Sequence, residues 1–167
     1  MRNIYIILIL IFSFTIFSCA KKDESSSTTS NTELEGAWVS SCYSKWDTYW
    51  LKTWTITGSA LVVKWDEYSD SSCATDYAIW TDTYSSFSIG NEATLDNGST
   101  GRKFTMKVDS FVGSLQTAAA VTSYNLLQSG SGYCGFSDWA LNTTKDYTGK
   151  TCGSTDYAAA NTNIYGV

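Results

Sequence analysis

The feature that most constrains the fold is a stretch in which apolar and polar residues alternate strictly. Phe104, Met106 and Val108 alternate with polar or charged neighbours over residues 103–109. Because successive side chains of a strand point to opposite faces, this period of two is typical of a strand with one buried face. Other segments are similarly rich in strand-forming residues: residues 36–43, 52–57, 60–68, 77–89, 139–147 and 161–167. Short strands at regular spacing predict an antiparallel all-β domain, a sandwich or a barrel.

Turn-forming residues separate the expected strands. Asn97-Gly98 is a strong hairpin signal, since both residues adopt positive φ at little cost. Similar clusters occupy residues 57–59 and 148–150. These turns divide the chain into the short strands that an all-β domain needs.

Two segments carry helical signals. Residues 114–128 contain three consecutive alanines and a helical spacing of larger residues, which predicts one short helix that closes an end of the barrel or lies across it. Trp46, Trp50 and Trp54 are also four residues apart, so residues 45–54 fit a helical start. The threonine-rich continuation to residue 57 favours a strand for that segment.

The N-terminus carries a targeting pattern. Arg2 precedes an apolar run over residues 4–17, shorter than the roughly 20 residues that a membrane-spanning helix needs. The run matches the apolar part of a signal peptide. Ile16-Phe17-Ser18-Cys19 resembles a bacterial lipobox, in which the cysteine is acylated and becomes the new N-terminus. An uncleaved anchor or an ordinary secretory signal is the alternative.

The lipobox resemblance implies three regions. Residues 1–18 are expected to be a lipoprotein signal peptide, residues 19–32 a lipidated N-terminus with a flexible Ser/Thr-rich tether, and residues 33–167 one folded domain. Lipid on Cys19 would anchor the protein to a membrane without spanning it. Ala20-Lys21 resembles outer-membrane sorting, so we expect a lipid-anchored protein of the bacterial cell envelope, at the outer membrane.

The cysteine count agrees with export. If Cys19 carries lipid, an even four remain, which an exported domain can oxidise: Cys42, Cys73, Cys134 and Cys152. Four cysteines allow three pairings. We favour Cys42 with Cys73 and Cys134 with Cys152, because each pair is local and falls at a turn or strand end. A zinc site is disfavoured by the spacing and by the absence of histidine.

Composition excludes several functions. Net charge is −5, and Arg102 is the single arginine after the leader, so no basic patch for nucleic acid is expected. Without histidine the commonest general base is missing, and Ser/His or Cys/His nucleophilic sites are excluded. The sequence also has no glycine-rich phosphate loop. We therefore expect no enzyme activity, no catalytic residues, no cofactor and no metal.

Acidic residues leave one chemical possibility open. Five of them gather in the first half of the domain: Asp66, Glu67, Asp70, Asp76 and Asp82. They would supply a glycosidase pair or a calcium site only if the fold made them converge. The simpler interpretation is that they face solvent on adjoining strands and a loop.

Tryptophans leave a second possibility open. Trp46, Trp50, Trp65 and Trp80 are candidates to line a cup for an apolar or sugar ligand, because aromatic faces bury much area while their edges tolerate water. The alternative is that such residues form the core.

One group of motifs suggests a family. Gly36-Ala37-Trp38 matches the Gly-x-Trp of the first strand in lipocalin-like barrels. The segments 68–73 and 123–152, each with cysteines, resemble the two cysteine modules of small lipocalin-like lipoproteins of Gram-negative bacteria. This resemblance covers most of residues 34–152. It implies a calycin-type antiparallel β-barrel, short or incompletely closed, in which Gly36 permits a tight entry and Trp38 packs as a plug at one end.

These inferences lead to one expected function and two rivals. The expected function is a non-enzymatic envelope protein, held to the membrane by its lipid, that binds a small hydrophobic or amphipathic ligand in its barrel. The first rival is a surface-exposed structural or protein-interaction (adhesion-type) module with a filled core, whose protein partner the sequence does not name. The second is a carboxylate-dependent hydrolase that acts through Asp66, Glu67 or Asp70.

Overall fold

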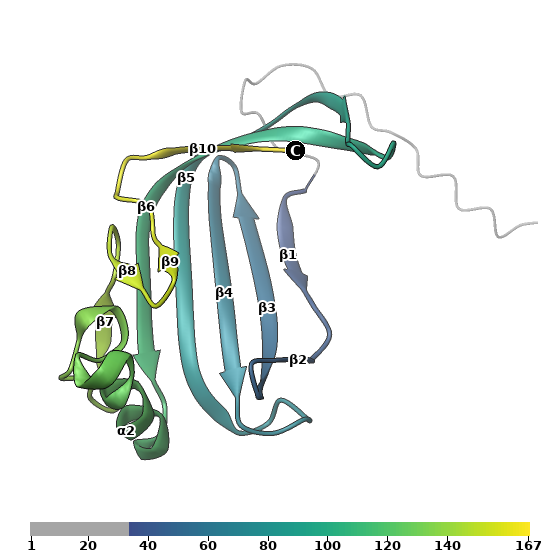
Figure 1. The fold of residues 1–167 in the computed structure, drawn as a ribbon. Helices are drawn as coiled ribbons and strands as arrows, with labels where there is room; N and C mark the ends of the chain where they lie inside the picture. The colour runs from purple at the N-terminus through teal and green to yellow at the C-terminus, as the bar shows by residue number, and fades with distance from the viewer. Residues whose placement is uncertain (1–33) are drawn as a thin grey trace, which may run out of the picture.

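The computed structural model describes residues 34–167, which form a curved eight-stranded antiparallel sheet, a separate two-stranded sheet and one α-helix (Figure 1). Strands take up 54% and helices 11% of this part of the chain, which confirms the all-β prediction. The strands are β1 (Gly36–Val39), β2 (Tyr43–Lys45), β3 (Thr48–Thr57), β4 (Ala60–Tyr68), β5 (Asp76–Thr94), β6 (Thr100–Leu115), β7 (Thr144–Asp146), β8 (Thr151–Cys152), β9 (Thr155–Asp156) and β10 (Asn163–Gly166). The helices are α2 (Ala118–Leu126) and the 3₁₀ turns η1 (Gln128–Gly130) and η2 (Tyr133–Gly135). The predictions for residues 1–33, including lipidation of Cys19, concern residues outside the described range.

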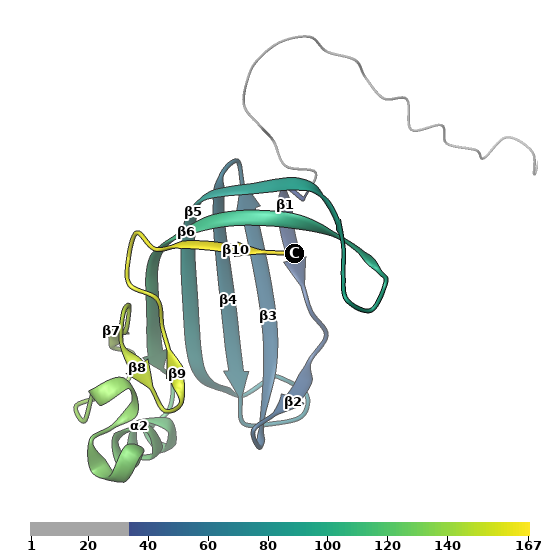
Figure 2. The same cartoon turned by 45° about the horizontal axis from the view of Figure 1, so that its top comes forward.

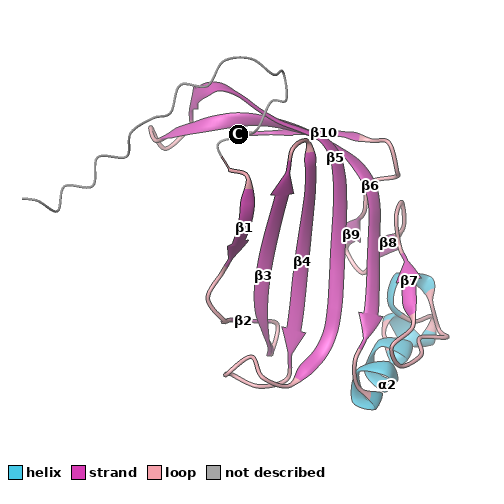
Figure 3. Cartoon of the chain, turned by 180° about the vertical axis from the view of Figure 1, so that it is seen from behind, coloured by secondary structure: helices cyan, strands magenta, loops and turns pink. Residues whose placement is uncertain are grey.

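The sheet runs in the order β1-β3-β4-β5-β6-β10, with β2 paired to β3 and β7 paired to β6. Its edge strands do not pair with each other anywhere in residues 34–167, so the sheet is not closed into a barrel. The β5–β6 hairpin is longer than its neighbours, because β4 pairs with β5 only as far as Tyr84. Figures 1 and 2 show its far part and β10 sweeping across one end of the sheet. The opposite end of the sheet carries α2 (Figure 3).

Several predicted turns are confirmed. Asn97-Gly98 lies in the connection between β5 and β6, where Gly98 has φ 81° and donates its N–H to the Leu95 carbonyl. Gly58, with φ 57°, connects β3 to β4. The segment 45–54 is a hairpin and has no helix, because Lys45 pairs with Thr48 across a two-residue loop.

Two sequence predictions need correction. The helix begins at Ala118 instead of residue 114, because Leu115 is fully buried in β6 opposite Ala78. Thr117 caps the helix, since its hydroxyl accepts a hydrogen bond from the Ala120 N–H at 3.1 Å. The strand expected over residues 139–147 is reduced to β7. The start of that segment is held by α2 instead, since Asn125 bonds both the N–H and the carbonyl of Trp139.

The core lies between the inner face of the sheet and the segment that follows β6. Trp80 is at its centre, and its ring centroid lies 5.4–5.9 Å from those of Tyr124, Tyr133, Trp139 and Tyr147. Gly113 is the residue opposite Trp80 on β6. A Cβ at position 113 would lie 2.4 Å from the indole, so only glycine leaves room for that ring.

Two disulfides are present, in the pairing favoured from the sequence. Cys42–Cys73 ties the segment before β2 to the β4–β5 loop, and Cys134–Cys152 ties η2 to β8. None of the helices in residues 34–167 has the length and apolar character needed to cross a membrane.

Candidate functional site: a groove on the inner face of the sheet

The strand register lines up one face of the sheet in rows. Residues paired across antiparallel strands share a face, and every second residue returns to it. Four rows cross β3, β4, β5 and β6 in that order: Trp50, Glu67, Ala78, Leu115; then Lys52, Trp65, Trp80, Gly113; then Trp54, Val63, Asp82, Phe111; then Ile56, Leu61, Tyr84, Val108. Aromatic side chains therefore occur in all four rows, and the last row is the most aliphatic.

A groove of two adjoining cavities lies on this face. The first, here called the apolar pocket, has a volume of about 490 Å³. The second, here called the aromatic pocket, has a volume of about 540 Å³. Trp65 and Asp82 line both cavities and form the wall between them.

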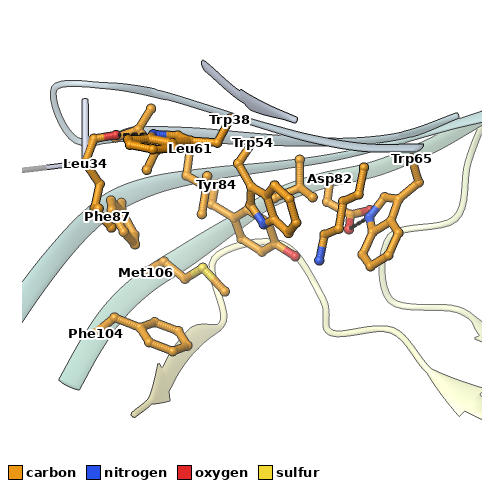
Figure 4. A pocket seen from close by; sticks show the side chains of 13 residues that line it. Leu34, Trp38, Trp54, Leu61, Trp65, Asp82, Tyr84, Phe87, Phe104 and Met106 are labelled. Carbon is orange, nitrogen blue, oxygen red and sulfur yellow. Dashed lines mark hydrogen bonds between the residues drawn. The ribbon is translucent and has the colours of Figure 1, made fainter. Parts of the chain in front are cut away.

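The apolar pocket is hydrophobic at one end and polar at the other. Figure 4 shows Leu34, Trp38 and Phe87 together at one end and Trp65 and Asp82 at the other. The floor between them is made by side chains of β3, β4 and β6: Trp54, Ile56, Leu61, Val63, Phe104 and Met106. A cavity with this polarity suits a molecule that has an apolar body and one polar end.

Trp38 does not plug the end of a barrel. Its side chain is 51% exposed on the edge strand β1, opposite Trp54, and its Nε1 donates to the Leu34 carbonyl at 2.9 Å. The expectation of a packed plug is wrong because the sheet does not close over this edge. Trp38 forms part of the rim of the apolar pocket instead. Gly36 has φ 129°, and no atom lies near the position its Cβ would take, so its role here is conformational and does not relieve crowding.

A cation and a carboxylate form the polar end of this pocket. Lys52 Nζ lies 3.7 Å from the centroid of the Trp65 ring and 4.5 Å from that of Trp54. Trp65 Nε1 donates to Asp82 Oδ2 at 2.9 Å. Burial lowers the pKa of Lys52, and the negative charge of Asp82 raises it in part. Burial raises the pKa of Asp82, and the positive charge of Lys52 lowers it in part.

The four tryptophans singled out from the sequence all line the aromatic pocket: Trp46, Trp50, Trp65 and Trp80. Trp50 and Trp80 are each 7% exposed and also belong to the core, whereas Trp46 is 77% exposed. Trp46 and Asp47 form the tip of the β2–β3 hairpin with φ of 51° and 64°, a conformation that is rare for a bulky side chain. This turn holds the Trp46 ring at the mouth of the pocket.

Glu67 is the buried charge of the aromatic pocket. The residue is 4% exposed, and its carboxylate accepts hydrogen bonds from Trp80 Nε1 at 3.2 Å and from the Tyr124 hydroxyl at 2.9 Å. Burial raises the pKa of Glu67, and these hydrogen bonds oppose the shift. All of its hydrogen-bond partners are uncharged, and neither ion pair found within residues 34–167 includes it.

Asp82 is the second acidic residue that lines the groove, whereas Asp66 and Asp70 do not line either cavity. Asp66 points to the other face and pairs with Lys64 at 2.7 Å. Asp70 sits in the exposed β4–β5 loop, where it accepts the Thr75 N–H at 2.6 Å. Of the three residues named for the hydrolase hypothesis, Asp66, Glu67 and Asp70, only Glu67 lines a pocket. Residues 34–167 contain no group of three or more His, Cys, Asp or Glu side chains that could hold a metal ion.

Sequence reasoning missed the tyrosines that complete the aromatic pocket: Tyr77, Tyr124, Tyr133, Tyr147 and Tyr157. All but Tyr77 come from α2 and the segment after it, which folds back over the sheet. Burial raises the pKa of Tyr124, Tyr133 and Tyr147 far above the ordinary value, so these hydroxyls stay protonated and can donate. The one signal in the sequence was the helical position of Tyr124.

Comparisons with known proteins give no relative from which a role could be transferred. Neither the scan against protein-family models nor the search of curated proteins finds a match for this chain.

Proposed function

We propose that this protein is a lipid-anchored protein of the bacterial cell envelope that binds a small amphipathic molecule in the groove of its sheet. The observation that carries the proposal is the polarity of the apolar pocket, which runs from Leu34, Trp38 and Phe87 to Lys52 and Asp82. An acyl chain or a similar body would bury the exposed apolar end, and a polar head would meet the charged end.

The proposal includes a fold relationship. We place the domain with the lipocalin-like proteins, as an incompletely closed member. Support comes from the consecutive antiparallel strands β3 to β6, which go up and down in chain order, and from Gly36-Ala37-Trp38 on the first strand. A ligand groove on the concave face is the usual place for a binding site in such folds.

The proposed location rests on the N-terminal sequence. The apolar run that ends at Cys19 supports export and lipidation. Two disulfides in the domain also fit an oxidising compartment. The rival of a display module with a filled core has less support, because the sheet carries two cavities of about 490 and 540 Å³.

A binding titration tests the proposal. The processed chain, residues 19–167 with Cys19→Ser to remove the lipid, would be purified oxidised and titrated with lauric acid while tryptophan emission is followed. We expect saturable binding that weakens about ten-fold in Trp38→Ala, which removes a rim contact worth on the order of 1.4 kcal/mol. The matched control is Tyr165→Ala, another exposed aromatic that lines neither pocket. Absence of saturable binding, or equal affinity in all three proteins, would exclude the apolar pocket as the site.

A further inference from the structure

We infer that the aromatic pocket binds the ammonium group of a ligand, either a quaternary amine or a protonated primary amine. The inference deepens the proposed function and rests on it only in that the two pockets share the Trp65–Asp82 wall. It assigns a specific chemistry to the aromatic pocket, because the apolar body of the ligand would occupy the apolar pocket alone.

A cation of the protein already lies against the tryptophan rings of the aromatic pocket. Lys45 Nζ lies 3.8 Å from the centroid of the Trp46 ring, 5.7 Å from that of Trp65 and 5.9 Å from that of Trp50. Cation–π attraction acts within about 6 Å of a ring centroid and is strongest for tryptophan. A side chain of the protein itself thus shows that the faces of three indoles converge on a place suited to positive charge.

The buried carboxylate of the aromatic pocket has no positively charged partner among the described residues. Glu67 is almost completely buried, and the groups that donate hydrogen bonds to it in the described structure, Trp80 and Tyr124, are both neutral. A carboxylate in such a place is costly unless a positive charge compensates it. Lys45 is directed over the Trp46 ring and forms no ion pair with Glu67 in the described structure. A ligand ammonium would supply the missing charge.

The aromatic pocket is also accessible to a ligand. Trp46 is largely exposed at the tip of the β2–β3 hairpin, so its ring can cover a ligand that enters the mouth of the pocket. The hairpin is held in place by Trp50 Nε1, which donates to the Thr48 hydroxyl at 2.8 Å and to the Lys45 carbonyl at 3.2 Å. Tyr124 and Tyr133 form the opposite wall, and their rings meet edge to face with centroids 5.2 Å apart. Aromatic faces on several sides of a carboxylate constitute a cage for an alkylated ammonium.

The test compares choline with 3,3-dimethylbutan-1-ol, which has the same shape without the charge. Calorimetric titration of the processed chain carrying Cys19→Ser is expected to give at least about ten-fold tighter binding of choline. Glu67→Gln, which keeps an acceptor for Trp80 and Tyr124, should weaken choline binding about ten-fold. Lys45→Met should tighten it about five-fold, because a competing cation leaves the rings.

Matched variants separate this site from the apolar pocket. Trp46→Ala should weaken choline binding and leave lauric acid binding unchanged, whereas Trp38→Ala should do the reverse. Both side chains are more than half exposed, so neither change should affect folding. If lauric acid fails to bind but choline binds with this pattern, the proposed function fails and the ammonium site stands.

A further arm distinguishes the two sources of an ammonium group. Dodecylphosphocholine below its micellar concentration should bind more tightly than choline and respond to both Trp38→Ala and Trp46→Ala if the natural ligand is a lipid headgroup with its chain. Equal affinity for the two compounds points to a free small amine.

Three results would overturn the inference. The first is equal binding of choline and its neutral analogue, and the second is tighter binding of glucose than of choline. The third is unchanged affinity for choline in both Glu67→Gln and Trp46→Ala.

Discussion

Trp65 donates its indole N–H to the carboxylate of Asp82 on the neighbouring strand, at 2.9 Å, and the pair separates the two cavities of the groove. The bond fixes an aromatic face and a negative charge in the same wall. A ligand that occupies both cavities has to pass this wall, so the pair is placed to influence the affinity of an elongated molecule more than that of a compact one.

Replacing this indole should change the acidity of its partner. In Trp65→Phe the donor is lost, and since this hydrogen bond lowers the pKa of Asp82 against the effect of burial, the pKa should rise further. Carboxyl ¹³C chemical shifts of labelled aspartate across pH would measure it. Trp54→Phe is the control, because the Trp54 indole gives no hydrogen bond to Asp82. An unchanged Asp82 titration in Trp65→Phe would contradict the prediction.

The close contact of Gly113 with Trp80 predicts a destabilising substitution. Gly113→Ala would place a Cβ 2.4 Å from the indole, and overpacking of this kind costs about 1–3 kcal/mol. Urea denaturation measures the loss in the free energy of unfolding. Gly90→Ala is the matched control, because a Cβ there meets Lys103 at an ordinary 3.6 Å. Equal stability of the two variants would show that the core can shift to accept the methyl group.

Stability should depend on pH in an unusual way. The pKa values of Glu67 and Asp82 are raised by burial, so between their ordinary values of 4.5 and 3.8 and the raised values the folded state holds more protons than the unfolded chain. The free energy of unfolding then falls as pH rises through that window. The pKa values of three other residues are lowered: Asp70, Asp138 and Asp146. Their contribution to the free energy of unfolding is lost as pH falls below 3.8 towards the lowered values.

These opposite slopes place the stability maximum near pH 4. Chemical denaturation at a series of pH values between 2.5 and 7.5 would show it. The double variant Glu67→Gln, Asp82→Asn should lose the decline on the alkaline side and keep the acid side. A maximum between pH 6 and 8 in the parent protein would contradict this prediction.

Each disulfide should contribute to stability in relation to the chain it closes. The separations are 31 residues for Cys42–Cys73 and 18 for Cys134–Cys152, for which loop-closure entropy gives about 4 and about 3 kcal/mol. Paired Cys→Ser replacements of each bond, followed by denaturant titration, measure these losses. Non-reducing peptide mapping checks the connectivity, and a peptide that joins Cys42 to Cys134 would refute it.

The anchor is tested at Cys19. Cys19→Ser should abolish labelling of the protein with a fatty acid and either release it from the membrane fraction or leave the precursor unprocessed. Metabolic labelling and fractionation of whole cells provide the measurement, with Cys42→Ser as the control for a cysteine outside the lipobox. Retained labelling and membrane association in Cys19→Ser would rule out the anchor.

The local pattern of the sequence was enough to predict the strands and turns. Alternation identified the segment around Met106, and Asn97-Gly98 identified its hairpin, because both signals act over a few residues. The same reasoning failed at residues 139–143. There a strand-like composition is overridden by the hydrogen bonds of Asn125, which lies on a helix and is distant in sequence.

The candidate site could be predicted only in part. The tryptophans of the aromatic pocket were identified because their residue type suggests a ligand surface, and the sheet register does bring them together. The exposure of Trp38 was not predictable, since it depends on whether the far edges of the sheet meet. Nor was the burial of Glu67 apparent, because Tyr124, 57 residues later in the chain, helps to cover it.

The connectivity of the cysteines also has a consequence for biogenesis. Along the domain, the first cysteine is bonded to the second and the third to the fourth, so neither bond encloses a cysteine of the other. A chain delivered from its N-terminus would present Cys73 to Cys42 before Cys134 emerged, and the correct partner would be the first one available. Maturation by this route needs an oxidant but no enzyme to reshuffle wrongly joined thiols.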